Sequence, residues 1–212
     1  MTAADQCVHC DHLTATIEAA HERALVALTS PDAGRFDAVV WLSAHLAAVD
    51  RVVTPLLDRH VARDLAARRH ERRVTRELQR LLRVLEQVAA SDALAPRTDA
   101  AQLRGQLVGL LAEHAATEHL LVEHLARALG EEKTAQVAAR YERAVTHGPT
   151  RPHPHQPHIR GLRTWLFGFD RVRDRLLDVF DSRHVPIPAP RRPPTPSGKW
   201  GSYLLGGMNR RD

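Results

Sequence analysis

The hydrophobic positions of this chain recur at steps of three and four residues, which is the period of a helix with one apolar side. No run alternates apolar and polar residues with the period of two that a half-buried strand shows. Prolines and small polar residues interrupt the helical pattern between its stretches. The pattern predicts helices over residues 12–29, 36 to beyond 57, 68–88 and 102–129.

Four helices of this length, joined by short turns, pack antiparallel with their apolar sides facing one another. We therefore expect an all-α protein, an antiparallel up-down four-helix bundle with additional C-terminal helices. The further helical patterns cover residues 131–147 and Leu162 to Phe180. Prolines alternate with other residues between these two segments, which favours an extended linker.

The chain of 212 residues accordingly reads as one domain with appendages. Its main part is the helical bundle, and an amphipathic helix is expected to dock on that bundle. The predicted boundaries are a flexible N-terminus over 1–11, the bundle over 12–147, a Pro/His-rich linker over 148–160, the docking helix over 161–184 and a Pro-rich basic tail over 185–212.

The longest apolar stripe, within residues 102–129, contains two polar side chains. His114 and Glu118 stand four residues apart on the side that should be buried. A bare carboxylate and an imidazole in a core each cost several kcal/mol unless something pairs with them. A metal ion is a common partner for both groups.

The other predicted helices also carry a histidine in or beside the apolar stripe. His21, His45 and His70 take these positions, and Asp50 follows His45 on the second helix. Imidazole and carboxylate ligands together suit iron or manganese, and carboxylates can bridge two metals in a bundle core. The candidate metal ligands are His21, His45, Asp50, His70, His114 and Glu118, with His12 as an alternative to His21.

A structural interpretation competes with the metal site. A His–Glu pair four residues apart is also an ordinary helix pair, and a single core histidine is usually only hydrogen-bonded. Glu71 and Glu123 are interpreted as charges on the solvent face. The alternative function is therefore a metal-free or mono-metal helical scaffold or interaction protein with a degenerate site.

Charge and cysteine content narrow the class of protein. The formal net charge of +5 comes from the C-terminal segment, where residues 151–212 hold 12 basic against 5 acidic residues. This weakens an interpretation of the main domain as a nucleic-acid binder. Cys7 and Cys10 are too few and too close for a disulfide scaffold. Without a signal peptide or an apolar run of membrane-spanning length, we expect a cytoplasmic protein with no membrane span.

Two segments resemble motifs of the hemerythrin-like (HHE cation-binding) family, actinobacterial type. WLSAHLAAVDRVVTPLL, around His45, is similar to that family's motif on its second helix, including the proline ten residues after the histidine. LAEHAATEHLLVEHL, around His114 and Glu118, is similar to the motif on its fourth helix. The resemblance covers roughly residues 10–180.

The resemblance implies a non-haem di-iron centre in a four-helix bundle, which binds or senses dioxygen, nitric oxide or iron. His45, His70, His114 and Glu118 match the family's ligands, and His21 or His12 is the ligand from the first helix. No residue pattern indicates a general acid or base, a phosphate loop or a dinucleotide motif. Binding or sensing is therefore expected rather than turnover of a substrate.

One position departs from the family's pattern. The acid on the second helix usually stands four residues after the histidine, where this chain has Val49, whereas Asp50 stands five after. Five residues of regular α-helix correspond to about 500° of rotation and leave the two side chains roughly 140° apart. Whether the centre holds one metal or two is therefore left open by the sequence.

Overall fold

The computed structural model describes residues 11–61, 65–90 and 97–152. Within these ranges every regular element is helical and there is no strand. The elements in chain order are α1 Asp11–Thr29, α2 Asp37–Ala48, the π-helical turn η1 Val49–Val53, α3 Thr54–His60, α4 Leu65–Ala90, α5 Arg97–Leu129 and α6 Glu131–Thr146. The predicted all-helical class is confirmed for the described residues, and the segment Leu162 to Phe180 lies outside them.

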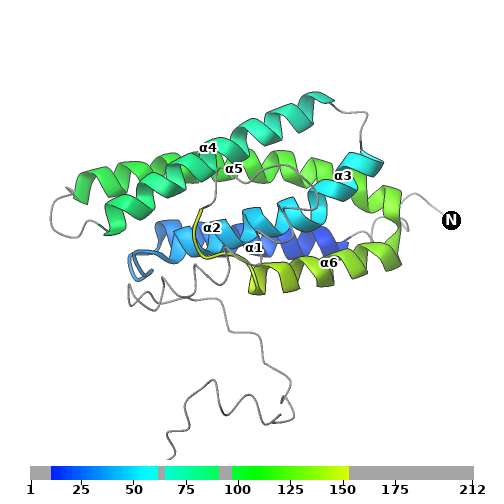
Figure 1. Ribbon diagram of the computed structural model, residues 1–212, viewed down its shortest axis with the longest axis horizontal. Helices are drawn as coiled ribbons and strands as arrows, with labels where there is room; N and C mark the ends of the chain where they lie inside the picture. Colours follow the sequence, from blue (N-terminus) through cyan, green and yellow to red (C-terminus); the bar gives the residue numbers. More distant parts are fainter. Residues whose placement is uncertain (1–10, 62–64, 91–96, 153–212) are drawn as a thin grey trace, which may run out of the picture.

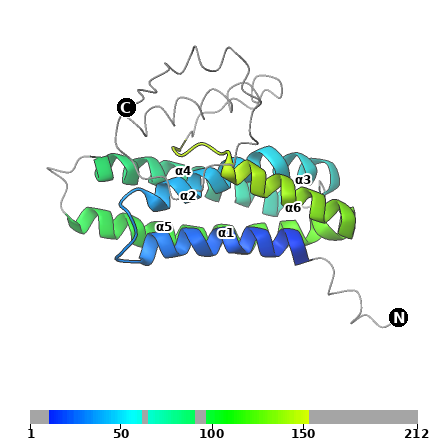
Figure 2. The same cartoon turned by 90° about the horizontal axis from the view of Figure 1, so that it is seen from below.

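The long helices α1, α2, α4 and α5 lie side by side, and successive ones run in alternating directions (Figure 1). Helix α4 packs on α5, α5 on α1, and α1 on α2, while α2 also contacts α4. Helix α6 packs against α1, α2 and the turn η1 (Figure 2). The apolar stripes of the four long helices therefore face a shared interior.

That interior consists of two separate apolar clusters. One joins residues of α1, α2, α4 and α5, among them Leu28, Leu42, Leu82 and Leu107. The other joins residues of α1, α2, η1, α3, α5 and α6, including Tyr141. On α1 the clusters meet between Ala20 and Ala24 and on α5 between Leu111 and Leu121, whereas on α2 the residues of the two clusters alternate. A short zone between the clusters is thereby left for polar side chains.

The second predicted helix contains a turn of π-helix. The N–H of Thr54 donates to the carbonyl of Val49, five residues back, where an α-helix would use the residue four back. Pro55 follows directly and has no N–H to offer the carbonyl of Arg51. The π-helical turn thus lies directly before Pro55, and the helical run continues beyond the proline to His60.

The continuous helical run Asp37–His60 is long and apolar enough to cross a membrane by length and composition alone. More than half of its most apolar window is buried inside the protein, as expected for a helix at the centre of a core. Ala38, Val39, Leu42 and Val53 on this run are each fully buried against other helices.

Shortening a leucine in the first cluster should destabilise the fold strongly. Leu82 is fully buried on α4, so Leu82→Ala removes apolar contacts and leaves a cavity. The expected loss is about 2–5 kcal/mol in the free energy of unfolding, measured by urea titration. Leu120→Ala on α5 is the control, because Leu120 is 55% exposed and its truncation should change stability by less than about 0.5 kcal/mol. Equal losses for both variants would contradict this description of the core.

Candidate metal centre

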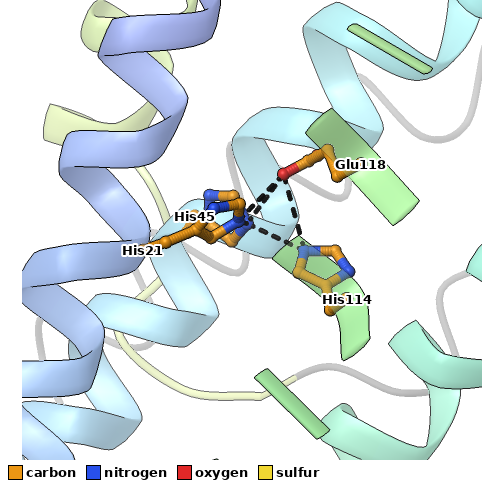
Figure 3. A group of neighbouring side chains, drawn as sticks. All are labelled: His21, His45, His114 and Glu118. Carbon is orange, nitrogen blue, oxygen red and sulfur yellow. Dashed lines mark hydrogen bonds and ion pairs between the residues drawn. The ribbon is translucent and has the colours of Figure 1, made fainter. Parts of the chain in front are cut away.

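Four side chains from three helices converge between the two apolar clusters (Figure 3). His21 comes from α1, His45 from α2, and His114 with Glu118 from α5. One ligand atom of each lies within 4.8 Å of the corresponding atoms of the other three. His114 is 0% exposed, Glu118 and His45 are 1% exposed, and His21 is 9% exposed. The sequence therefore brings four of its six candidate ligands to one buried place.

The spacing of these atoms matches the coordination sphere of a single ion. The Nε2 atom of His45 lies 3.2 Å from that of His21 and 3.0 Å from that of His114. The Oε2 atom of Glu118 lies 3.0, 3.5 and 3.6 Å from the Nε2 atoms of His21, His45 and His114. A tetrahedral ion with ligands at about 2.0–2.1 Å separates them by about 3.3–3.4 Å. The donor set thus fits one ion at its centre.

Of the four side chains, the carboxylate of Glu118 carries the largest free-energy cost of burial. Both of its oxygens are buried, and neither has a hydrogen-bond partner of good geometry. A buried acceptor without such a partner costs about 1–3 kcal/mol, and more when it is charged. A cation among the three imidazoles would offset this cost. The buried carboxylate without a hydrogen-bond partner is the feature that best indicates that the group could hold a metal ion.

His114 is held from its outer side by a second carboxylate. Its Nδ1 atom lies 2.8 Å from Oε1 of Glu71 on α4. Burial lowers the pKa of His114, but the negative charges of Glu118 and Glu71 outweigh it and leave that pKa raised. Glu71 was interpreted from sequence as a solvent-face charge. That interpretation is wrong, since its side chain is only 13% exposed and faces His114.

His45 has an outer partner as well. Its Nδ1 atom lies 2.6 Å from the hydroxyl of Tyr141 on α6. Burial, followed by the proximity of His21 and His114, holds the pKa of His45 well below its usual value. Burial and the charge of Glu118 raise the pKa of the Tyr141 hydroxyl. His45 is therefore neutral at physiological pH and has a ring nitrogen available for a metal.

Two candidates from the sequence lie elsewhere. His70 on α4 is 36% exposed, and its Nε2 atom lies 3.0 Å from Oε1 of Glu113. Asp50 lies in η1 and is half-buried, outside the group of four. On α1 the group includes His21, whereas His12 is exposed near the start of the helix.

The apolar period of α4 itself indicates Glu71 as an inward-facing position. The buried apolar positions of α4 are Val74, Leu78, Leu81, Leu82 and Leu85. Read backwards from Leu85, the buried positions alternate steps of four and three residues and reach Val74 by a step of four. The next step of three leads to Glu71, whereas His70 would need a second step of four in succession. Tyr141 offered no comparable signal, because its role depends on how α6 packs across α2.

Three imidazole nitrogens and one carboxylate oxygen suit several divalent transition metals, among them iron, manganese and zinc. The charged residues farther out on α5 have other partners. Glu123 contacts His119 and Arg127 at the surface, as the sequence predicted.

Comparison of the chain with protein-family models, with curated proteins and with solved structures finds no match.

Proposed function

We propose that this chain is a hemerythrin-like metal protein, in which an antiparallel four-helix bundle binds a metal ion, iron by family resemblance, and a diatomic ligand such as dioxygen or nitric oxide. One observation carries the proposal. Three buried imidazole nitrogens and one carboxylate oxygen lie within 4.8 Å of one another, and five of their six separations are 3.0–3.6 Å. The order of ligands along the chain, with a histidine on each of two helices and then His-x-x-x-Glu, supports the resemblance.

A single ion is favoured over a di-iron pair. A second iron would need its own ligands, for which the sequence offered His70 and Asp50. Among the described residues, only His21, His45, His114 and Glu118 group together. The position of Val49 within the apolar cluster, where the family pattern has an acid, supports the same conclusion. We therefore propose a mononuclear centre in place of the di-iron centre that the family resemblance implies.

The protein's own contribution to the chemistry is positioning and exclusion of water. Apolar residues of α1, α2 and α5 flank the four ligands on both sides along the helices. A redox-active ion such as iron, when bound there, supplies the affinity for a small diatomic molecule. A dry apolar shell around a metal controls solvent access and its reduction potential. Such surroundings suit binding or sensing of a small ligand better than turnover of a polar substrate.

A metal-free scaffold is the competing function, and one observation favours it. His45 Nε2 lies within hydrogen-bond distance of both other Nε2 atoms, so the histidines can partly satisfy one another. This arrangement does not satisfy Glu118, because its oxygens still have no hydrogen-bond partner of good geometry. The metal centre therefore explains more of the buried polar atoms than the scaffold does.

Metal content tests the proposal directly. The protein is purified anaerobically and its metal is counted, and visible spectra are recorded before and after adding dioxygen or nitric oxide. We expect about one ion per chain and a spectral change on adding the ligand. His114→Ala should abolish both, whereas His124→Ala, an exposed histidine on the same helix, should change neither.

The other outcomes are equally informative. Two irons per chain would restore the di-iron centre. Metal without any response to diatomic ligands would limit the function to metal binding. Absence of metal in a folded wild-type protein, even after incubation with ferrous iron, would refute the metal centre and leave the scaffold.

A further inference from the structure

We propose that Glu71 is a positioning residue of the metal centre: its carboxylate holds His114 in the tautomer that binds metal and supplies the second negative charge that a divalent ion requires. The inference rests on the proposed metal-binding function. It concerns a residue on α4, the one long helix that contributes no direct ligand to the group.

The position of Glu71 is fixed by contacts on several sides. Its Oε1 atom lies 2.8 Å from Nδ1 of His114, as a close ion pair and not as a hydrogen bond of good geometry. The same oxygen accepts a hydrogen bond of 2.9 Å from the hydroxyl of Thr75, one turn along α4. Its Oε2 atom is buried without a hydrogen-bond partner. The side chain is therefore oriented toward His114 rather than toward solvent.

This contact selects one tautomer of His114. A neutral imidazole carries one proton, and a carboxylate can only accept. With Glu71 beside Nδ1, the proton is favoured on Nδ1, and Nε2 keeps its lone pair. That lone pair points into the group, where Nε2 lies 3.0 Å from Nε2 of His45. Carboxylate–histidine–metal arrangements of this kind fix the ring and make the ligand more basic.

The same carboxylate balances charge. Glu118 and Glu71 together carry two negative charges, while neutral histidines carry none. A divalent ion makes this set neutral, whereas a trivalent ion leaves an excess positive charge in a buried place, which is costly. The centre is therefore matched to a divalent ion. Loss of the charge on Glu71 should weaken binding of such an ion without removing any of its direct ligands.

The first test needs no metal. Side-chain ¹⁵N NMR of the metal-free protein, recorded at a pH where His114 is neutral, should show its one ring proton on Nδ1. In Glu71→Ala the proton should shift toward Nε2 or exchange between the two nitrogens. Glu77→Ala on the same helix is the control, because Glu77 pairs with Arg80 at the surface. An unchanged tautomer in Glu71→Ala would overturn the positioning role.

The second test uses Co²⁺ as a probe, titrated against a chelator of known affinity. Glu71→Ala should weaken Co²⁺ binding about 10–100-fold and alter the Co²⁺ absorption bands. Glu71→Gln keeps the shape and an acceptor oxygen but not the charge, so it should restore the tautomer while leaving the affinity below wild type. Equal Co²⁺ affinity in wild type and both variants would overturn the charge role.

The two proposals fail in different ways. If wild type binds no Co²⁺, the proposed function and the charge role of Glu71 both fail, while the NMR experiment still decides the contact with His114. If wild type binds Co²⁺ and the Glu71 variants match it in affinity and tautomer, only the role of Glu71 fails. A urea titration of each variant shows whether it folds, and Glu71→Gln serves where Glu71→Ala does not.

Discussion

Replacing Glu118 with leucine is expected to make the metal-free protein more stable and to abolish its stabilisation by metal. In the metal-free protein the carboxylate is buried, and neither oxygen has a hydrogen-bond partner of good geometry. A buried charged acceptor without a hydrogen-bond partner costs about 1–3 kcal/mol or more, and a leucine of similar volume avoids this cost. The two cores that flank the group would then join through the new leucine.

Metal should stabilise the wild type but should not stabilise Glu118→Leu. A metal present at 100 times its Kd stabilises the wild type by about 2.7 kcal/mol. For a chain of this size that corresponds to a rise in Tm of roughly 5–11 °C, at about 2–4 °C per kcal/mol. Glu118→Leu should show no rise. Thermal unfolding with Co²⁺ and with a chelator measures both effects.

Glu123→Leu, on the same helix, serves as the control for this experiment. Glu123 is half-exposed and contacts His119 and Arg127, so its replacement should leave the metal response intact. A metal-free Glu118→Leu protein that is less stable than wild type would show that Glu118 is already paired favourably without metal. That outcome would count against a site built for a cation.

Replacing His45 with alanine should eliminate metal binding. His45 lies at the centre of the group, since its Nε2 atom contacts His21, His114 and Glu118. Three remaining ligands would surround an open space, and Tyr141 would lose its partner. We expect no stoichiometric binding of Co²⁺ in a chelator-competition titration that detects tight binding in wild type.

Free imidazole provides the check on this prediction. The space left by the ring is enclosed, because His45 is 1% exposed, and it has the shape of the missing group. Added imidazole should therefore restore part of the Co²⁺ binding. His60→Ala, an exposed histidine at the end of the same helical run, should bind Co²⁺ like wild type. Undiminished binding by His45→Ala would exclude His45 as a ligand.

The sequence predicted the helices well because their apolar periods are local. His114 and Glu118 were found because one helix holds both, and His21 and His45 because each lies on or beside a regular stripe. Glu71 was not predicted to face the site, because the neighbouring His70 was taken as the metal ligand on that helix.

The surroundings of His45 depended on contacts that no local pattern records. Tyr141 meets it from α6, a helix that the sequence placed only as an extra segment. The π-turn was not predicted either, because the apolar period alone does not distinguish a π-turn from an α-helix. The rotation of about 500° between His45 and Asp50 therefore assumed a regular α-helix, which the backbone at Asp50 does not follow.

That π-turn corrects the phase of the central helical run. In an uninterrupted α-helix, twelve residues separate His45 from Leu57 by about 1200°, which leaves Leu57 roughly 120° away from the direction of His45. The π-turn accommodates one extra residue, so the separation becomes that of eleven α-helical steps, about 1100°, and the offset falls to roughly 20°. Both side chains are buried on the inner side of the run. One additional residue thus allows the same helix to place a histidine in the polar group and leucine farther along in the apolar core.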